Sequence, residues 1–262
     1  MSKALTYTSY LKIDELLALQ QPRSDPPEHD EPLFITIHQV YELWFKQVLH
    51  ELDHVKVTLE QDDTPRTLQT LKRILTIFKT LVAQVDILET MTPLDFLSFR
   101  DRLDSASGFQ SFQFRELEFV LGHKQQSALL NYAEASVQRQ RLAIRYQQPS
   151  LWDAFLHYLH QEGYAIPDAL LNRDVTQSIM PAPALHPILV EIYRRDVKNM
   201  QLCERLLDLD EGIQEWRYRH VKMVERTIGT KSGTGGSAGV DYLKHTLFTP
   251  LFPDLWAIRT EL

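Results

Sequence analysis

His220 is flanked in the sequence by apolar side chains and by several cations. Trp216 and Val224 stand four residues before and after it, so a helix here would place an apolar side chain on each side of the imidazole. A haem face needs dry cover, and its two propionates need cationic partners. The nearest cations in sequence are Arg217, Arg219, Lys222 and Arg226. The pattern permits a haem on His220 without establishing one.

His38 lies on a helical face that it shares with Phe34, Glu42 and Phe45. A histidine beside two phenylalanines is commonly a core residue whose hydrogen bonds are satisfied, and in other proteins it belongs to a ligand pocket. The residues alone leave both interpretations open.

Arg100 stands one helical turn after Phe96, so a fork-shaped cation and an aromatic plane point the same way. A guanidinium of this kind can hold a carboxylate through two parallel hydrogen bonds. Its commoner role is an ion pair one helical turn away, here with Asp104. Both roles stay open for Arg100.

Glycines are rare in the chain, with 9 among 262 residues, yet five of the nine fall between residues 229 and 239. Residues 233–238 match the GxGxxA of dinucleotide-binding folds, but that fingerprint lies between a strand and a helix. The residues before 229 have a helical pattern, so we reject the dinucleotide interpretation. The run either offers backbone N–H groups to an anion such as a carboxylate or simply connects two elements.

Helices must position these residues, because apolar side chains recur with helical spacing almost throughout the chain. The two longest expected helices cover residues 33–59 and 64–92, the second starting with Thr64 before Pro65. Thr92 and Ser150 each stand three positions before an acidic residue and should cap two more helices. Further helices are expected over residues 111–121, 133–146, 187–209 and 211–228. Strand patterns are scarce, so the sequence predicts an all-α fold with loops at residues 20–31 and 229–239.

Charge and cysteine content exclude several classes of protein. The chain carries 28 Lys and Arg against 35 Asp and Glu, a formal charge of −7, which argues against nucleic acid as a partner. No apolar run approaches the roughly 18 residues of a membrane span, and the first residues lack the layout of a secretory signal. We therefore expect a cytoplasmic protein that does not enter a membrane. A single cysteine, Cys203, rules out an internal disulfide, a thiolate zinc finger and a covalently attached haem.

Several stretches of the chain together resemble the tryptophan 2,3-dioxygenase family. They are residues 5–17 (LTYTSYLKIDELL), 30–53 (DEPLFITIHQVYELWFKQVLHELD), 88–119 (LETMTPLDFLSFRDRLDSASGFQSFQFRELEF), 216–220 (WRYRH) and 229–243 (GTKSGTGGSAGVDYL). They run from the first residues to near the C-terminus, and their order is far more specific than any single motif. The resemblance implies an all-α, multi-helix bundle domain over residues 32–262 that encloses a non-covalent haem b. It also implies a helical N-terminal segment, residues 1–31, that docks on a neighbouring subunit.

The same resemblance implies a dioxygenase that inserts both atoms of O2 across the indole C2–C3 bond of L-tryptophan. The product would be N-formyl-L-kynurenine, formed in the first step of tryptophan catabolism by the kynurenine route. Ferrous haem b is the expected cofactor, O2 the co-substrate and a homotetramer the expected assembly. Two alternatives stay open. A haem enzyme of the same superfamily would insert one oxygen atom into a tryptophan derivative, and a non-catalytic haem sensor would bind O2 or NO without turnover.

The resemblance also assigns roles to matching positions of this sequence. His220 corresponds to the proximal haem ligand, and His38 to the distal histidine that forms a hydrogen bond with the indole N–H. Arg100 would hold the substrate carboxylate with Phe96 beside it, and because some members carry tyrosine at Phe96, a phenol hydroxyl is missing here. The other substrate-binding positions are Phe34 in the indole pocket, Ser107 in the distal pocket, Gly233 and Thr234 at the amino-acid end, and Tyr7 and Tyr10, which would reach into the site of a neighbouring subunit.

Overall fold

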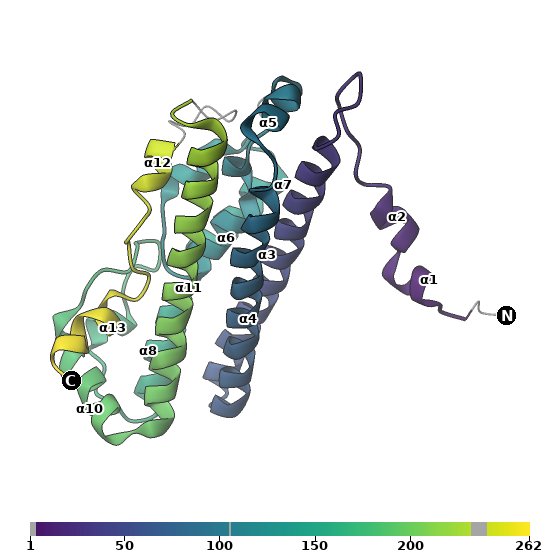
Figure 1. The fold of residues 1–262 in the computed structure, drawn as a ribbon. Helices are drawn as coiled ribbons and strands as arrows, with labels where there is room; N and C mark the ends of the chain where they lie inside the picture. The colour runs from purple at the N-terminus through teal and green to yellow at the C-terminus, as the bar shows by residue number, and fades with distance from the viewer. Residues whose placement is uncertain (1–3, 105, 232–239) are drawn as a thin grey trace.

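The computed structural model describes residues 4–104, 106–231 and 240–262, and every regular element in these ranges is helical, which confirms the all-α fold. Figure 1 shows the helices as a bundle with one extended segment beside it. The α-helices are α1 (Tyr7–Leu11), α2 (Ile13–Leu17), α3 (Glu31–Glu60), α4 (Thr64–Leu88), α5 (Pro93–Arg100), α6 (Phe112–Val120), α7 (Val137–Gln147), α8 (Leu151–Gln161), α9 (Asp168–Leu171), α10 (His186–Arg195), α11 (Val197–Ile228), α12 (Val240–Lys244) and α13 (Pro253–Ala257). Short 3₁₀ helices are η1 (Asp101–Leu103), η2 (Gly108–Gln110), η3 (Gln126–Asn131), η4 (Pro183–Leu185) and η5 (Ile258–Thr260).

Three long helices, α3, α4 and α11, form the frame of the bundle. α4 packs against both α3 and α11, and α6 and α8 pack against α3 (Figure 1). α3 runs for its full length because buried apolar side chains follow helical spacing along one face, from Ile37 and Phe45 near its start to Val55 and Leu59 near its end. The packed helices give rigid walls on which side chains can be positioned.

Local cap residues start several helices where the sequence predicts them. Thr92 and Ser150 each accept the backbone N–H three residues later, and the acidic side chain at that position accepts the cap's own N–H in return. α4 starts at Thr64, as the sequence predicts. Its cap is Asp63, whose carboxylate accepts a backbone N–H at 3.1 Å, and Thr64 is the first helical residue.

The expected helices over residues 187–209 and 211–228 are wrong in their boundary. The structure has α10, a break at Asp196, and then α11 as one continuous helix through residue 210. The break falls at Asp196 because its carboxylate accepts the N–H of Asn199 at 3.1 Å and caps a new helix there.

Two other expected helices are shorter than the sequence suggests. The helix expected over residues 133–146 begins only at Val137, because the Ser136 side chain caps it. α4 ends at Leu88 rather than at residue 92, so the chain can turn before Thr92 caps α5. The helix expected over residues 111–121 is confirmed as α6.

The buried core comprises a large cluster along the bundle, a smaller one at the end that carries α5, and a third between α6, η3 and α7. The smaller cluster brings together Ile37 of α3, Val85 of α4, Phe96 and Phe99 of α5, and Met223 of α11. Four helices from distant parts of the sequence therefore meet at this end of the bundle.

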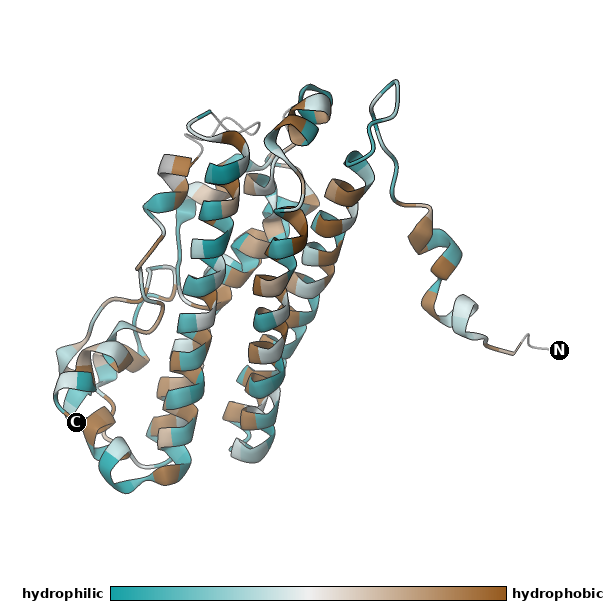
Figure 2. Cartoon of the chain, in the orientation of Figure 1, coloured by the Kyte–Doolittle hydropathy of each residue, from teal (hydrophilic) through white to brown (hydrophobic). Residues whose placement is uncertain are grey.

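Residues 4–30, here called the N-terminal arm, lead away from the bundle (Figure 1). The helical N-terminal segment expected from the sequence is present as α1 and α2. Large apolar side chains of the arm are exposed, with Tyr7 at 77%, Tyr10 at 72% and Leu17 at 70%. Figure 2 shows the brown segments of the arm without another part of the chain against them. Helices this short bury too little surface to be stable by themselves.

No helix in the described ranges is both long and apolar enough to cross a membrane. Cys203 is buried and is not part of a disulfide. The cytoplasmic location expected from the sequence stays a prediction.

Candidate active site

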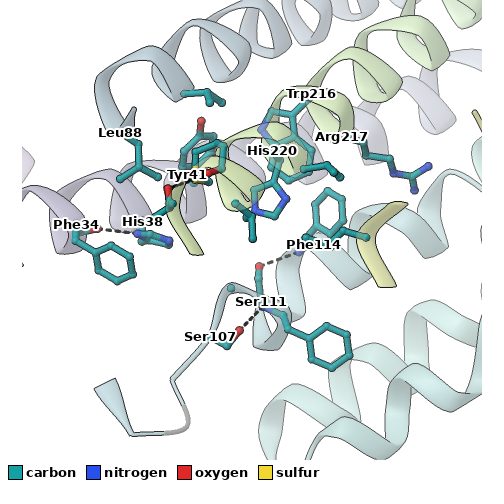
Figure 3. Close-up of a pocket in the computed structure, with 18 of the residues that line it drawn as sticks. Phe34, His38, Tyr41, Leu88, Ser107, Ser111, Phe114, Trp216, Arg217 and His220 are labelled. Atoms are coloured by element: carbon teal, nitrogen blue, oxygen red, sulfur yellow. Dashed lines mark hydrogen bonds between the residues drawn. The ribbon is translucent and has the colours of Figure 1, made fainter. Parts of the chain in front are cut away.

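A cavity of about 230 Å³ lies at the α5 end of the bundle, lined mainly by α3, α4, α5, α6 and α11. Most lining side chains are aliphatic or aromatic, and a few polar groups converge on the space (Figure 3). Sites that bind small molecules and cofactors commonly have this composition. Six residues predicted from the sequence line this one cavity: Phe34, His38, Phe96, Arg100, Ser107 and His220.

Of the other four predicted site residues, two do not line this cavity and two lie outside the described residues. Tyr7 and Tyr10 lie on the N-terminal arm and do not line the cavity of their own chain. Gly233 and Thr234 lie outside the described residues, so their predicted contacts stay predictions.

His38 faces the cavity from α3 with one ring nitrogen already engaged. Its Nδ1 lies 2.7 Å from the carbonyl oxygen of Phe34, which can only accept a hydrogen bond. In the neutral ring Nδ1 therefore carries the hydrogen, and Nε2 is left as an acceptor. Burial lowers the pKa of His38, against the opposing effects of the Phe34 carbonyl and the Glu42 charge. The ring also packs on Phe34, at 4.1 Å between ring centroids. His38 is thus a neutral acceptor in an apolar wall.

His220 faces the same cavity from α11. Its ring stacks on Trp216, with centroids 5.2 Å apart and planes 10° apart. Burial, together with the charge that His38 would carry if it were protonated, lowers the pKa of His220 to about 4. Among the described residues no partner forms a hydrogen bond with the ring, and its remaining accessible surface faces the cavity. A neutral, oriented imidazole with a free lone pair can coordinate a metal ion.

Two buried arginines share one carboxylate at another part of the cavity wall. Arg115 Nη1 donates to Glu118 Oε2 at 2.6 Å, and Arg217 Nη2 donates to Glu118 Oε1 at 3.1 Å. All three side chains are at most 10% exposed and line the cavity. The cluster holds two positive charges and one negative charge, so it suits a further anion in the cavity.

Only one of the four cations near His220 in sequence lines the cavity. Arg217 lines it, whereas the other three lie on faces of α11 that carry surface ion pairs. Arg219 pairs with Asp86 and Glu89, Lys222 pairs with Glu225, and Arg226 pairs with Glu89. Sequence proximity to His220 does not by itself bring a cation to the cavity, because residues two, five and nine positions after Arg217 lie on other faces of the helix.

The indole N–H of Trp216 is a buried donor without a hydrogen-bond partner among the described residues. Burial raises the pKa of the nearby Tyr41 hydroxyl to about 12, and the Trp216 indole opposes this shift. The Tyr41 hydroxyl nevertheless donates its hydrogen bond to the Leu81 carbonyl oxygen, at 2.8 Å. A buried donor left over at a cavity wall is costly unless a ligand accepts from it.

Phenylalanines of α3 and α5 build the apolar wall beside His38. Phe34, Phe96 and Phe99 pack with ring centroids 5.5 to 5.6 Å apart in each pair. Arg100, the last residue of α5, is half-buried and reaches the cavity next to this wall. An arginine beside an aromatic wall can hold the carboxylate of an aromatic amino acid.

The segment after α5 reaches the cavity through Ser107. Its hydroxyl accepts the N–H of Phe109 at 3.3 Å and caps η2, while Ser111 caps α6 by accepting the N–H of Phe114 at 3.2 Å (Figure 3). These caps fix the chain that crosses the cavity wall, so the Ser107 hydroxyl is held in place.

Sequence reasoning missed Arg115, Glu118 and the free donor of Trp216. The available signal was three charged residues, Arg115, Glu116 and Glu118, within the aromatic-rich run FQFRELEFV, since α6 buries all three. The partner Arg217 lies 99 residues from Glu118, so no local pattern could connect them.

Comparisons with known proteins give one family. The family model described as Tryptophan 2,3-dioxygenase matches residues 1–165 and 183–262. The chain is 64% identical over 262 residues to a relative named tryptophan 2,3-dioxygenase from Herpetosiphon aurantiacus, covering 100% of both chains. It is 54% identical over 261 residues to one of the same name from Anaeromyxobacter sp. (strain K), covering 100% of this chain and 97% of the relative. A third, from Caulobacter vibrioides, is 44% identical over 265 residues with 100% of both covered.

Proposed function

The chain belongs to the tryptophan 2,3-dioxygenase family, and we propose on this premise how its own residues perform the reaction. The protein is a dioxygenase that inserts both atoms of O2 across the indole C2–C3 bond of L-tryptophan and gives N-formyl-L-kynurenine. The observation that carries the assignment of residues is that His38 and His220 face one apolar cavity together with Arg100.

A haem b fits the residues that line the cavity. His220 offers a neutral imidazole with a free lone pair to the iron, and Trp216 stacks on that imidazole. Arg115, Arg217 and the unpartnered indole N–H of Trp216 would hold the two propionates. When bound, ferrous haem supplies the binding and activation of O2, which amino-acid side chains alone do not provide.

The remaining cavity residues bind and orient tryptophan. His38 Nε2 accepts the indole N–H, because Nδ1 is already occupied by the Phe34 carbonyl. Phe34 and Phe96 cover the indole ring, and Arg100 holds the carboxylate. His38 need not remove the proton, since the indole nitrogen can keep it while C2 and C3 react.

Two further contacts belong to the proposal at the amino-acid end of the substrate. Ser107, which lines the cavity, contributes a hydroxyl to the distal pocket. Gly233 and Thr234 contact the ammonium and carboxylate groups, as expected from the resemblance.

The active site is completed by a second copy of the chain in a homotetramer. Tyr7 and Tyr10 are more than 70% exposed on an arm that leaves its own bundle, so a partner surface is needed to bury them. A neighbouring chain whose cavity takes these tyrosines supplies that surface. Residues 1–31 then form a docking segment, and residues 32–262 form the catalytic domain.

The test is a product analysis with isotopic oxygen. The haem-loaded protein is reduced without air, mixed with L-tryptophan and ¹⁸O₂, and the product is analysed by mass spectrometry. The proposal requires N-formylkynurenine that carries two labelled oxygen atoms. One labelled atom in an oxidised indole product would favour the single-oxygen alternative. Binding of O2 with unchanged tryptophan would favour a gas sensor.

A further inference from the structure

The Glu31 carboxylate is buried in an unusual place, at the first turn of α3, where the N-terminal arm ends. Its residue is only 1% exposed. Oε1 accepts the backbone N–H of Arg23 at 2.7 Å, and Oε2 accepts that of Ser24 at 3.0 Å. Burial acts to raise the pKa of Glu31, but the contacts with Ser24 and Arg23 and the Arg102 charge outweigh it, so the pKa is lowered. The side chain is therefore an anion that holds Arg23 and Ser24 of the arm in place.

A second anchor lies two turns further along the same helix. Gln39 Nε2 donates to the Leu19 carbonyl at 3.1 Å, and the Gln20 side chain donates to Gln39 Oε1. Together, Glu31 and Gln39 fix residues 19–24, here called the root of the arm, against the start of α3. The preceding residues 4–18 are exposed along nearly their whole length, so these anchors decide the direction in which the arm projects.

The anchored root lies on the face of α3 that also serves the cavity. Residues 31, 34 and 38 are spaced by three and four, so Glu31 shares a helical face with Phe34 and His38. The direction of the arm is thus set on the same rigid element that positions the distal histidine.

We propose that Glu31 is a positioning residue for the substrate site of a neighbouring copy, because it aims the arm that carries Tyr7 and Tyr10. This inference rests on the proposed sharing of the site between chains. An arm fixed at its root presents the tyrosines at a high effective concentration, and an arm released there samples many directions. Loss of the anchor therefore weakens tryptophan binding in the neighbouring copy while leaving the chain's own haem site intact.

The chemistry of the contact requires a carboxylate. Two consecutive backbone N–H groups point at two oxygen atoms, and charge strengthens both hydrogen bonds. Glutamine has nearly the same shape but offers one oxygen and one NH₂, so one backbone N–H would face another donor. Glu31→Gln is thus a small change that breaks the anchor without leaving a hole.

The first experiment measures steady-state kinetics of Glu31→Gln in the haem-loaded, full-length oligomer. Loss of one charge-assisted hydrogen bond at the root should raise the KM for tryptophan about five- to tenfold. The kcat should stay within about twofold, and haem content and helical circular dichroism should match the wild type. The matched control is Glu28→Gln, which removes the same charge from the same segment at a half-buried side chain, and its KM should not change. An unchanged KM in Glu31→Gln, or an equal rise in Glu28→Gln, would overturn the proposal.

The second experiment asks in which chain Glu31 acts. Glu31→Gln protein is mixed with an excess of Arg100→Ala protein under conditions that exchange subunits. Only the Glu31→Gln chains then have a working cavity, and most of those cavities receive an intact arm from an Arg100→Ala neighbour. The KM should return to the wild-type value. A KM that stays raised at every ratio would show that Glu31 serves its own chain.

A separate mixture tells this inference apart from the proposed function. Tyr7 and Tyr10 are both changed to Ala in one protein, and Arg100 is changed to Ala in the other. Activity that returns on mixing supports a shared site, so a negative Glu31 result would then refute the aiming role alone. Mixtures that stay inactive would refute the shared site, and the role of Glu31 with it.

Discussion

Glu118→Gln tests whether the buried arginine pair faces a cofactor. The Glu118 side chain is 7% exposed and bridges Arg115 at 2.6 Å and Arg217 at 3.1 Å. An ion pair near 4 Å contributes about 4 kcal/mol at an effective dielectric constant near 20, before the cost of desolvating the carboxylate. Breaking a buried pair on one side typically costs about 3–5 kcal/mol, because the other charge stays buried without a partner. We expect a loss of this size in the haem-free protein.

The loss should be much smaller once haem is bound. Two propionates bring negative charge to Arg115 and Arg217, so the variant should lose only about 1 kcal/mol in the haem-loaded form. The difference between the two forms, about 2 kcal/mol or more, must appear as tighter haem binding by roughly thirtyfold.

Urea unfolding followed by circular dichroism, with and without haem, measures both losses. The matched control is Glu116→Gln on the same helix, whose carboxylate is 2% exposed and pairs with Arg141 at 3.0 Å away from the cavity. It should lose the same stability in both forms. If Glu118→Gln also loses the same stability with and without haem, Arg115 and Arg217 do not bind the propionates.

Three predictions concern tryptophan binding. Arg100→Lys replaces a two-pronged hydrogen-bond donor with a point charge and should raise the KM strongly, lowering kcat/KM by about 2 kcal/mol or more; an unchanged KM would assign Arg100 to a surface ion pair. His38→Ala should keep reduced activity, because the hydrogen bond to the indole orients it without taking its proton; complete loss of turnover with normal haem and tryptophan binding would make His38 an obligatory acid or base. In the wild type the neutral form of His38 is the acceptor, and burial lowers its pKa, so activity should persist as the pH falls through 6.5. The acid limb of kcat/KM should then lie below pH 6.5 and be absent in His38→Ala.

Features of the fold set by neighbouring residues were predictable from the sequence. The capping boxes at Thr92 and Ser150 depend on residues three positions apart, and the apolar face of α3 repeats every turn, so both were found. The break at Asp196 was missed because the residues on either side of it continue the same helical pattern, and only the side-chain cap separates α10 from α11.

Part of the candidate site could likewise be predicted from the sequence, and part could not. His38, Phe34, Phe96, Arg100, Ser107 and His220 were identified because they stand in motifs that resemble a known family, and the described chain brings all six to one cavity. The link between Glu118 and Arg217 was out of reach because it joins α6 to α11 across the bundle. The anchoring role of Glu31 was also out of reach, because the two N–H groups it accepts depend on how residues 23 and 24 fold back.

The most direct test of the account replaces the side chain of His220 and then returns its ring. His220→Gly should purify with little haem, since the imidazole is the one protein ligand assigned to the iron. Added imidazole can enter the space left beside Trp216 and should restore haem binding, the wild-type absorption spectrum and formation of N-formylkynurenine. His220→Gly that holds stoichiometric haem with a wild-type spectrum in the absence of imidazole would contradict the central claim that this cavity binds haem through His220.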